Sequence, residues 1–131
     1  MTRLLFYGLT PRLFLVLSTV WLAGCVSGRD AGRADARRDL SKGVLGIEAF
    51  GRHPSYVIDD YYPLLRERYG IRVSDFGCLV DDRTIEHVLG YNEIMDAELA
   101  RRFGTNYWRQ ALESARKSYE SKQRQRMEQQ R

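Results

Sequence analysis

IRVSDFGCLVDDRTIEHVLGYNEIMDAELARRFG, residues 71–104, contains both hydrophobic periods that distinguish strands from helices. Over residues 71–80 apolar and polar side chains alternate with a period of two and then run into a short apolar segment. This pattern predicts a strand, and Gly77 within it indicates a bulge or a close backbone approach.

The second half of the stretch predicts a helix. From residue 85 to residue 103 the apolar side chains recur at steps of three and four, which places them on one face. Asp81 or Asp82 is expected to cap this helix and Gly104 to close it. Gly90 lies in its middle, where glycine costs about 1 kcal/mol relative to alanine and allows a kink.

Two further helices flank this unit. One follows Asp59 or Asp60 as its cap, tolerates Pro63 in its first turn and ends at Gly70. The other begins after Thr105 or Asn106, and its apolar stripe ends at Tyr119. Its apolar face is expected to hold Trp108, Ala111, Leu112, Ala115 and Tyr119.

One strand cannot form a sheet, so a partner is required. The partner is expected at residues 44–50, at residues 56–59, or in another chain. Helices predominate in each case. The sequence therefore predicts a small, mainly helical α+β domain with one evident strand and three helices. Its core is expected to comprise Leu65, Val73, Phe76, Leu79, Ile85, Val88, Leu89, Leu99, Phe103, Trp108 and Leu112.

Both ends of the body differ from it in composition. Residues 26–42 are rich in Gly, Ala, Asp and Arg, with almost no large apolar side chains. Such a segment buries too little surface to offset its ordering entropy, so a flexible tether over residues 25–42 is predicted, with a short helix over 31–40 as the alternative. Residues 121–131 are predicted to be a polar basic tail. The domain is therefore expected to span residues 43–120, with both flanking segments dispensable for folding.

The first 24 residues have the features of an export signal. Arg3 and Arg12 provide a basic start, residues 13–22 are uncharged and apolar, and small residues follow. The apolar run is too short for a transmembrane helix, which requires about 20 residues.

The signal ends in Leu22-Ala23-Gly24-Cys25, which resembles the lipobox of bacterial lipoproteins. The resemblance covers only the export segment. It implies that the Cys25 thiol carries a lipid, that the chain is cut before Cys25, and that palmitate is incorporated. In lipoproteins of diderm bacteria, aspartate after the cysteine favours the inner membrane. Val26 in that position implies the periplasmic face of the outer membrane.

The charge balance gives no indication of nucleic-acid binding. The signal holds two of the 21 basic residues and none of the 17 acidic ones, so the remaining 107 residues carry 19 basic and 17 acidic side chains, a formal charge of +2. Such a small excess lacks the basic footprint of nucleic-acid proteins. We expect the bilayer and an envelope protein or cell-wall component as partners.

The second cysteine raises an enzymatic alternative. With Cys25 lipidated, Cys78 has no partner in the chain. Burial as a small apolar residue is expected, with an intermolecular disulfide or a reactive thiol as the alternatives. A thiol enzyme or hydrolase would need Cys78 beside a base, His87 or His53, and an orienting acid such as Asp81. The same side chains lack the local spacing of a metal site, so no metal or cofactor is predicted.

Tyrosine is the unusual feature of the composition. Seven of the eight tyrosines follow the signal, and Trp108 adjoins Tyr107. Aromatic rings with polar tips suit a binding surface for sugar or peptide. The pairs Tyr61-Tyr62 and Tyr107-Trp108 are the candidate contacts. The sequence thus predicts a non-enzymatic, membrane-tethered binding or accessory module.

Overall fold

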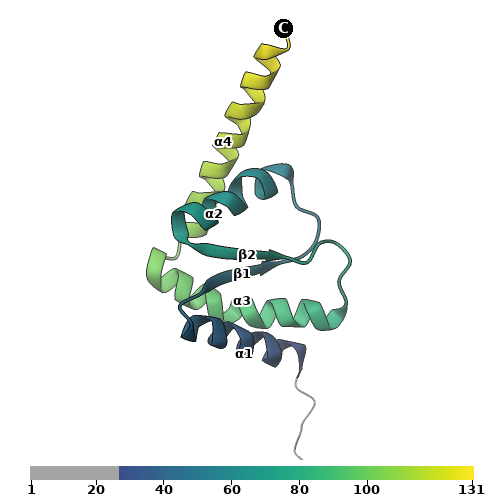
Figure 1. Cartoon of the computed structure of the whole chain (residues 1–131), viewed down its shortest axis with the longest axis vertical. Coiled ribbons are helices and arrows are strands. Elements are labelled where there is room, and N and C mark those ends of the chain that lie inside the picture. Colours follow the sequence, from purple (N-terminus) through teal and green to yellow (C-terminus); the bar gives the residue numbers. More distant parts are fainter. Residues whose placement is uncertain (1–26) are drawn as a thin grey trace, which may run out of the picture.

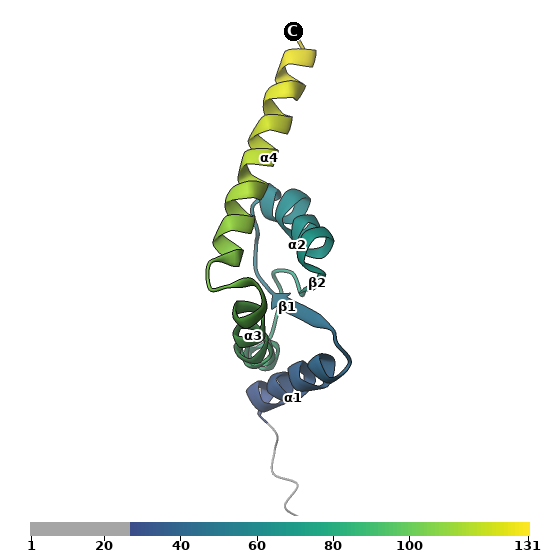
Figure 2. The same cartoon turned by 90° about the vertical axis from the view of Figure 1, so that its left-hand side faces the viewer.

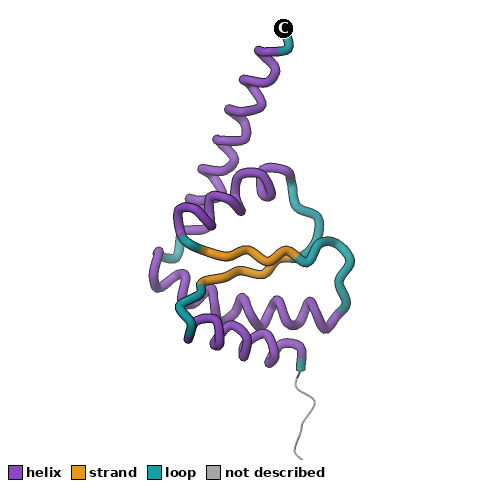
Figure 3. Tube along the Cα trace, in the orientation of Figure 1, coloured by secondary structure: helices purple, strands orange, loops and turns teal. Residues whose placement is uncertain are grey.

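Two short strands, β1 (Leu45–Ala49) and β2 (Ile71–Asp75), pair in parallel, with Leu45 opposite Ile71. The computed structural model describes residues 27–131, and these strands lie at its centre (Figures 1 and 3). The predicted partner segment at residues 44–50 is therefore confirmed. The predicted strand over 71–80 is too long. It ends at Asp75, because Gly77 adopts a left-handed φ of 73° and the chain turns into a loop.

A crossover connects the strands, as parallel pairing requires. It consists of a π-helical turn, η1 (Val57–Tyr61), followed by α2 (Tyr62–Tyr69). Gly70 ends α2 with a φ of 66°, as predicted. Asp60 does not cap a helix: it lies within η1 and is buried there.

Two long helices complete the predicted set, α3 (Asp82–Phe103) and α4 (Tyr107–Gln129). The Asp81 carboxylate accepts a hydrogen bond from the Thr84 amide at 2.7 Å and so caps α3. The helix runs unbroken through Gly90.

A fourth helix, α1 (Gly28–Ser41), occupies the segment predicted as a flexible tether, so that prediction is wrong. The alternative, a helix over 31–40, is confirmed and extends further at its N-terminal end. The small residues of this segment let α1 lie directly on α3. A Cβ at Gly32 would come within 2.0 Å of the His87 carbonyl oxygen, and one at Gly90 within 2.0 Å of the Arg29 carbonyl oxygen. The composition that indicated flexibility instead permits close backbone approach.

The elements stack in layers around the strand pair. Helices α1 and α3 pack below it in Figure 1, and α2 and the first half of α4 pack above it. Figure 2 shows that the C-terminal half of α4 projects away from the body, at the end opposite α1. The mainly helical α+β class is confirmed.

The core lies between these layers. Its buried members are Ala36, Leu45, Leu65, Ile71, Val88, Tyr91, Met95, Leu99, Tyr107, Ala111 and Ala115. Four predicted core residues are instead exposed: Phe76, Leu79, Leu89 and Trp108. Phe76 and Leu79 follow the end of β2. In α4 the predicted burial of Ala111 and Ala115 is confirmed, whereas at the start of the helix Tyr107 is buried in place of the exposed Trp108.

The folded unit is longer than residues 43–120 at both ends. It begins with α1 at Gly28, and α4 continues as one helix to Gln129. Residues 121–129 are therefore helical, and Lys122 reaches back to Asp60, with 2.6 Å between Nζ and Oδ1. The predicted tail is an extension of α4 that contributes the Lys122–Asp60 ion pair to the body.

Candidate functional site

An open groove of about 570 Å³ lies where η1, β1, α3 and the start of α4 meet. We call it the aromatic groove. Its lining residues are Ile47, Glu48, Tyr61, Asn92, Asp96, Ala100, Thr105, Tyr107 and Trp108. It combines three aromatic side chains with a short row of polar groups, the composition typical of sites that recognise small ligands or peptide segments.

Three of the four predicted contact residues line this groove. Tyr61 comes from η1, and Tyr107 and Trp108 come from the first turn of α4, so residues more than 40 positions apart in sequence meet. Trp108 keeps 45% of its surface exposed. Tyr62 does not line the groove; it packs edge-on against His53, with ring centroids 5.7 Å apart.

The charged side chains lining the aromatic groove are both acidic. The groove walls partly desolvate the Asp96 carboxyl group and raise its pKa, although the residue as a whole is exposed. The Glu48 side chain is only 9% exposed, and burial raises its pKa as well, against the opposing effect of His87. Carboxylates held in partly desolvated surroundings attract a cationic or hydrogen-bond-donating group.

Asn92 fixes Glu48 in the groove. Its side-chain carbonyl accepts from the Glu48 amide at 2.9 Å, and its side-chain NH2 donates to the Glu48 carbonyl at 2.7 Å. Asn92 thus pairs with the backbone N–H and C=O groups of one residue on the free edge of β1, as a neighbouring strand would. The backbone N–H and C=O of Glu48 are thus both held by α3, on the side of β1 that faces away from β2.

Behind the groove, His87 joins three elements. Doubly protonated, it donates through Nδ1 to Glu48 at 2.9 Å and through Nε2 to Asp35 of α1 at 3.2 Å. The hydrogen bond to Asp35 and the charge of Glu48 raise the pKa of His87 against the effect of burial, which is the largest single influence and lowers it. His87 therefore serves as a clamp between α1, β1 and α3.

A second polar cluster continues along the same layer. The Tyr91 hydroxyl donates to Asp39 of α1 at 2.8 Å, and Arg72 of β2 donates to the same carboxylate. Burial and the Asp39 carboxylate raise the pKa of Tyr91 to about 12. Gly46 leaves room for this hydroxyl, since a Cβ there would lie 2.5 Å from it.

The structure does not assemble the predicted thiol site. Cys78 is exposed rather than buried, and in the described chain no hydrogen bond joins it to a histidine. Both ring nitrogens of His87 are occupied, and Asp81 caps α3. His53 lies near Asp75, with 3.8 Å between Nε2 and Oδ2. Within residues 27–131 no group of three or more His, Cys, Asp or Glu side chains is placed to hold a metal ion.

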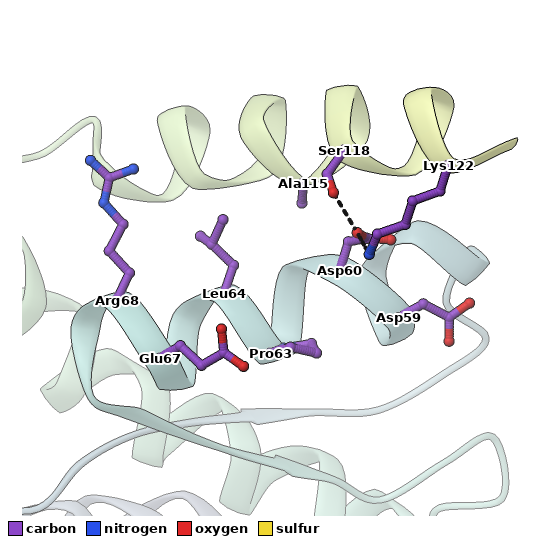
Figure 4. Close-up of a pocket in the computed structure, with 9 residues that line it drawn as sticks. All are labelled: Asp59, Asp60, Pro63, Leu64, Glu67, Arg68, Ala115, Ser118 and Lys122. Carbon is purple, nitrogen blue, oxygen red and sulfur yellow. Dashed lines mark hydrogen bonds and ion pairs between the residues drawn. The ribbon is translucent and has the colours of Figure 1, made fainter. Parts of the chain in front are cut away.

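A second pocket of about 470 Å³ lies between α2 and α4 (Figure 4). Asp60 is its buried charged residue, and its Oδ1 accepts hydrogen bonds from Ser118 at 2.9 Å and from Lys122 at 2.6 Å. Lys122 and Ser118 lower the pKa of Asp60 against the larger, opposing effect of burial. These contacts give Asp60 a structural role between η1 and α4.

Sequence reasoning missed Glu48, Asn92 and Asp96 as groove residues. Glu48 could have been found, because it is the charged residue within the short apolar segment 44–50. Asn92 and Asp96 are four residues apart on one helix, the spacing that places side chains on one face. Their meeting with Tyr61 and Trp108 depends on the crossover and on the direction of α4, which no local pattern specifies.

No family model, curated protein or solved structure matches this chain. None of the helices between residues 27 and 131 is long and apolar enough to cross a membrane. The predicted signal segment and lipid attachment site, residues 1–24 and Cys25, lie outside the described residues.

Proposed function

We propose that this protein is a lipid-anchored envelope module that binds a protein or cell-wall partner in the aromatic groove. The observation that carries the proposal is the meeting of Tyr61, Tyr107 and Trp108 with Glu48 and Asp96 in one open groove. The rings offer contact area at low entropic cost, and the exposed Asp96 carboxylate favours a partner that presents a cationic group.

The sequence supports the anchor independently. The basic start, the short apolar run and the Leu22–Cys25 motif together resemble a lipoprotein signal. Acyl chains on Cys25 would hold the domain at the bilayer, since each buried methylene contributes about 0.8 kcal/mol and two or more chains bind durably. The groove would then bind its partner close to the membrane but outside the lipid.

The fluorescence of Trp108 reports on the groove, because Trp108 is the only tryptophan after the signal.

Crosslinking tests the groove in the cell. A photo-crosslinking amino acid at Thr105, which lines the groove, should form an adduct with the partner in intact envelopes. The same group at Arg116, exposed on α4 and outside the groove, is the matched control.

We expect the Thr105 adduct to disappear in Trp108→Ala and to weaken in Asp96→Asn. Loss of one charged hydrogen-bonding partner costs about 1.5–3 kcal/mol, or roughly tenfold or more in affinity. The isolated partner should quench or shift the fluorescence of Trp108. Equal adducts at Thr105 and Arg116, unaffected by either substitution, would exclude the groove as the binding site.

A further inference from the structure

The loop that follows β2, residues 76–80 with the sequence FGCLV, presents apolar side chains to solvent. We call it the apolar loop. Leu79 is 98% exposed and Phe76 is 44% exposed, and Cys78 is also exposed. A contiguous apolar segment left uncovered in this way marks a contact surface.

The apolar loop is held in place at its base. The Phe76 amide donates to the Ala49 carbonyl at 2.9 Å, and the Gly51 amide donates to the Gly77 carbonyl at 2.7 Å. At its other end, Asp81 caps α3. The exposed residues are therefore carried on a short turn fixed at both sides (Figure 3).

This loop lies beside the point where the chain leads back to Cys25. Phe76 lines a small pocket together with Gly28 and Ala31 of the first turn of α1, and with Arg83 and Thr84 at the start of α3. Cys25 precedes Ser27, the first described residue, by two positions. Two residues span at most about 7 Å, so a bilayer that holds lipidated Cys25 lies next to the apolar loop.

We propose that the apolar loop inserts into the bilayer that holds the lipid anchor, as a second membrane contact beside Cys25. The proposal rests on the lipid anchor of the proposed function. The loop is bounded in sequence by Asp75, Asp81, Asp82 and Arg83, and Arg52 follows Gly51, which bonds to Gly77, so no basic cluster surrounds the loop. Burial of Phe76 and Leu79 provides the attraction, which requires no anionic lipid and persists at high salt.

Insertion would orient the domain. The apolar loop precedes α3, and Asp96 of the aromatic groove lies 14 residues along that helix, about 20 Å from its start. Two contacts at one end of α3 would restrict rotation about the anchor and hold the groove clear of the lipid.

Cys78 allows a direct test, because it is the remaining thiol when Cys25 is acylated. The full-length protein is purified from membranes, and its mass reports acylation of Cys25. An environment-sensitive fluorophore is attached to Cys78, and the protein is reconstituted into phosphatidylcholine vesicles with and without nitroxide-labelled acyl chains. We expect the emission of the fluorophore to shift to the blue and to be strongly quenched by the nitroxide. Both effects should persist at high salt.

Leu79→Asp should abolish the blue shift and the quenching. Its exposure makes this change compatible with folding. Ile58→Asp, at a residue that is 50% exposed on η1, is the matched control and should leave both signals intact.

The outcomes separate the two claims. An acylated protein whose fluorophore remains in water overturns the loop contact and leaves the anchor in place. A blue shift without nitroxide quenching shows the loop packed against protein, which also overturns it. An unmodified Cys25 overturns the anchor and, with it, the loop contact.

Discussion

Gly90 shows how tertiary packing outweighs helix propensity at a single residue. Alanine is favoured over glycine in an exposed helix by about 1 kcal/mol. At Gly90, however, a Cβ would lie 2.0 Å from the Arg29 carbonyl oxygen of α1. We expect Gly90→Ala to destabilise the protein by about 1–3 kcal/mol, because α1 must move off α3.

Thermal or denaturant unfolding measures this change. Glu113→Ala, at an exposed position of α4, is the control and should change the free energy of unfolding little. A Gly90→Ala variant as stable as the parent would contradict the close packing of α1 on α3.

His87 links stability to pH. Its pKa is raised above its ordinary value of 6.5, so the folded state binds the proton more tightly than the unfolded chain does. The stability it contributes is complete below pH 6.5 and is lost as the pH rises through the folded pKa. The raised pKa of Glu48 acts in the same direction, since its ionisation is disfavoured in the folded state.

We therefore expect the free energy of unfolding to decline from slightly acidic to mildly alkaline pH. In His87→Gln the decline should be shallower, because the titrating clamp is removed. Melting curves across this range report the slope. A parent protein and a variant with the same slope would show that His87 does not clamp α1 to β1.

At the scale of elements, the C-terminal half of α4 contacts η1 through Asp60. The Asp60 side chain is 4% exposed and that of Lys122 is 53% exposed. Removing one partner of a buried pair costs about 3–5 kcal/mol, and exposure of Lys122 reduces this to about 1–3 kcal/mol. We expect that loss in Lys122→Met, whereas Arg124→Met, two residues further along, should be neutral.

The same pair has a pH dependence of opposite sign to that of His87. Because the pKa of Asp60 is lowered, its contribution to stability is present above its ordinary pKa of 3.8 and is lost as the pH falls through the folded pKa.

Equal unfolding free energies for Lys122→Met and Arg124→Met would mean that the packing of α4 does not depend on Asp60.

The sequence predicted some elements better than others, for physical reasons. The strand, α2, α3 and α4 were predictable because each carries its own hydrophobic period or cap, as Gly70 shows for α2 and Asp81 for α3. Helix α1 was predicted only as the alternative to a tether, because its contacts depend on small residues such as Gly32, which carry no apolar period. The aromatic residues of the groove were predictable, because the sequence is unusually rich in tyrosine. The presence of Glu48 beside them was not, because it depends on the parallel pairing of β1 with β2.

At the scale of the whole molecule, the proposed anchor and the proposed binding site lie at different places in the fold. The chain emerges toward Cys25 at the α1 end, and α4 projects from the opposite end (Figure 2). The aromatic groove lies between them, beside the C-terminal half of α3. This arrangement suits a module held at one end and open to a partner along its side.

The lipid on Cys25 is the premise on which the proposed binding module and the membrane-contacting loop both depend. Labelling of growing cells with radioactive palmitate tests it most directly. The account predicts that the wild-type protein incorporates the label and fractionates with membranes, and that Cys25→Ala does neither. A wild-type protein that remains unlabelled, with Cys25 intact, would contradict the account.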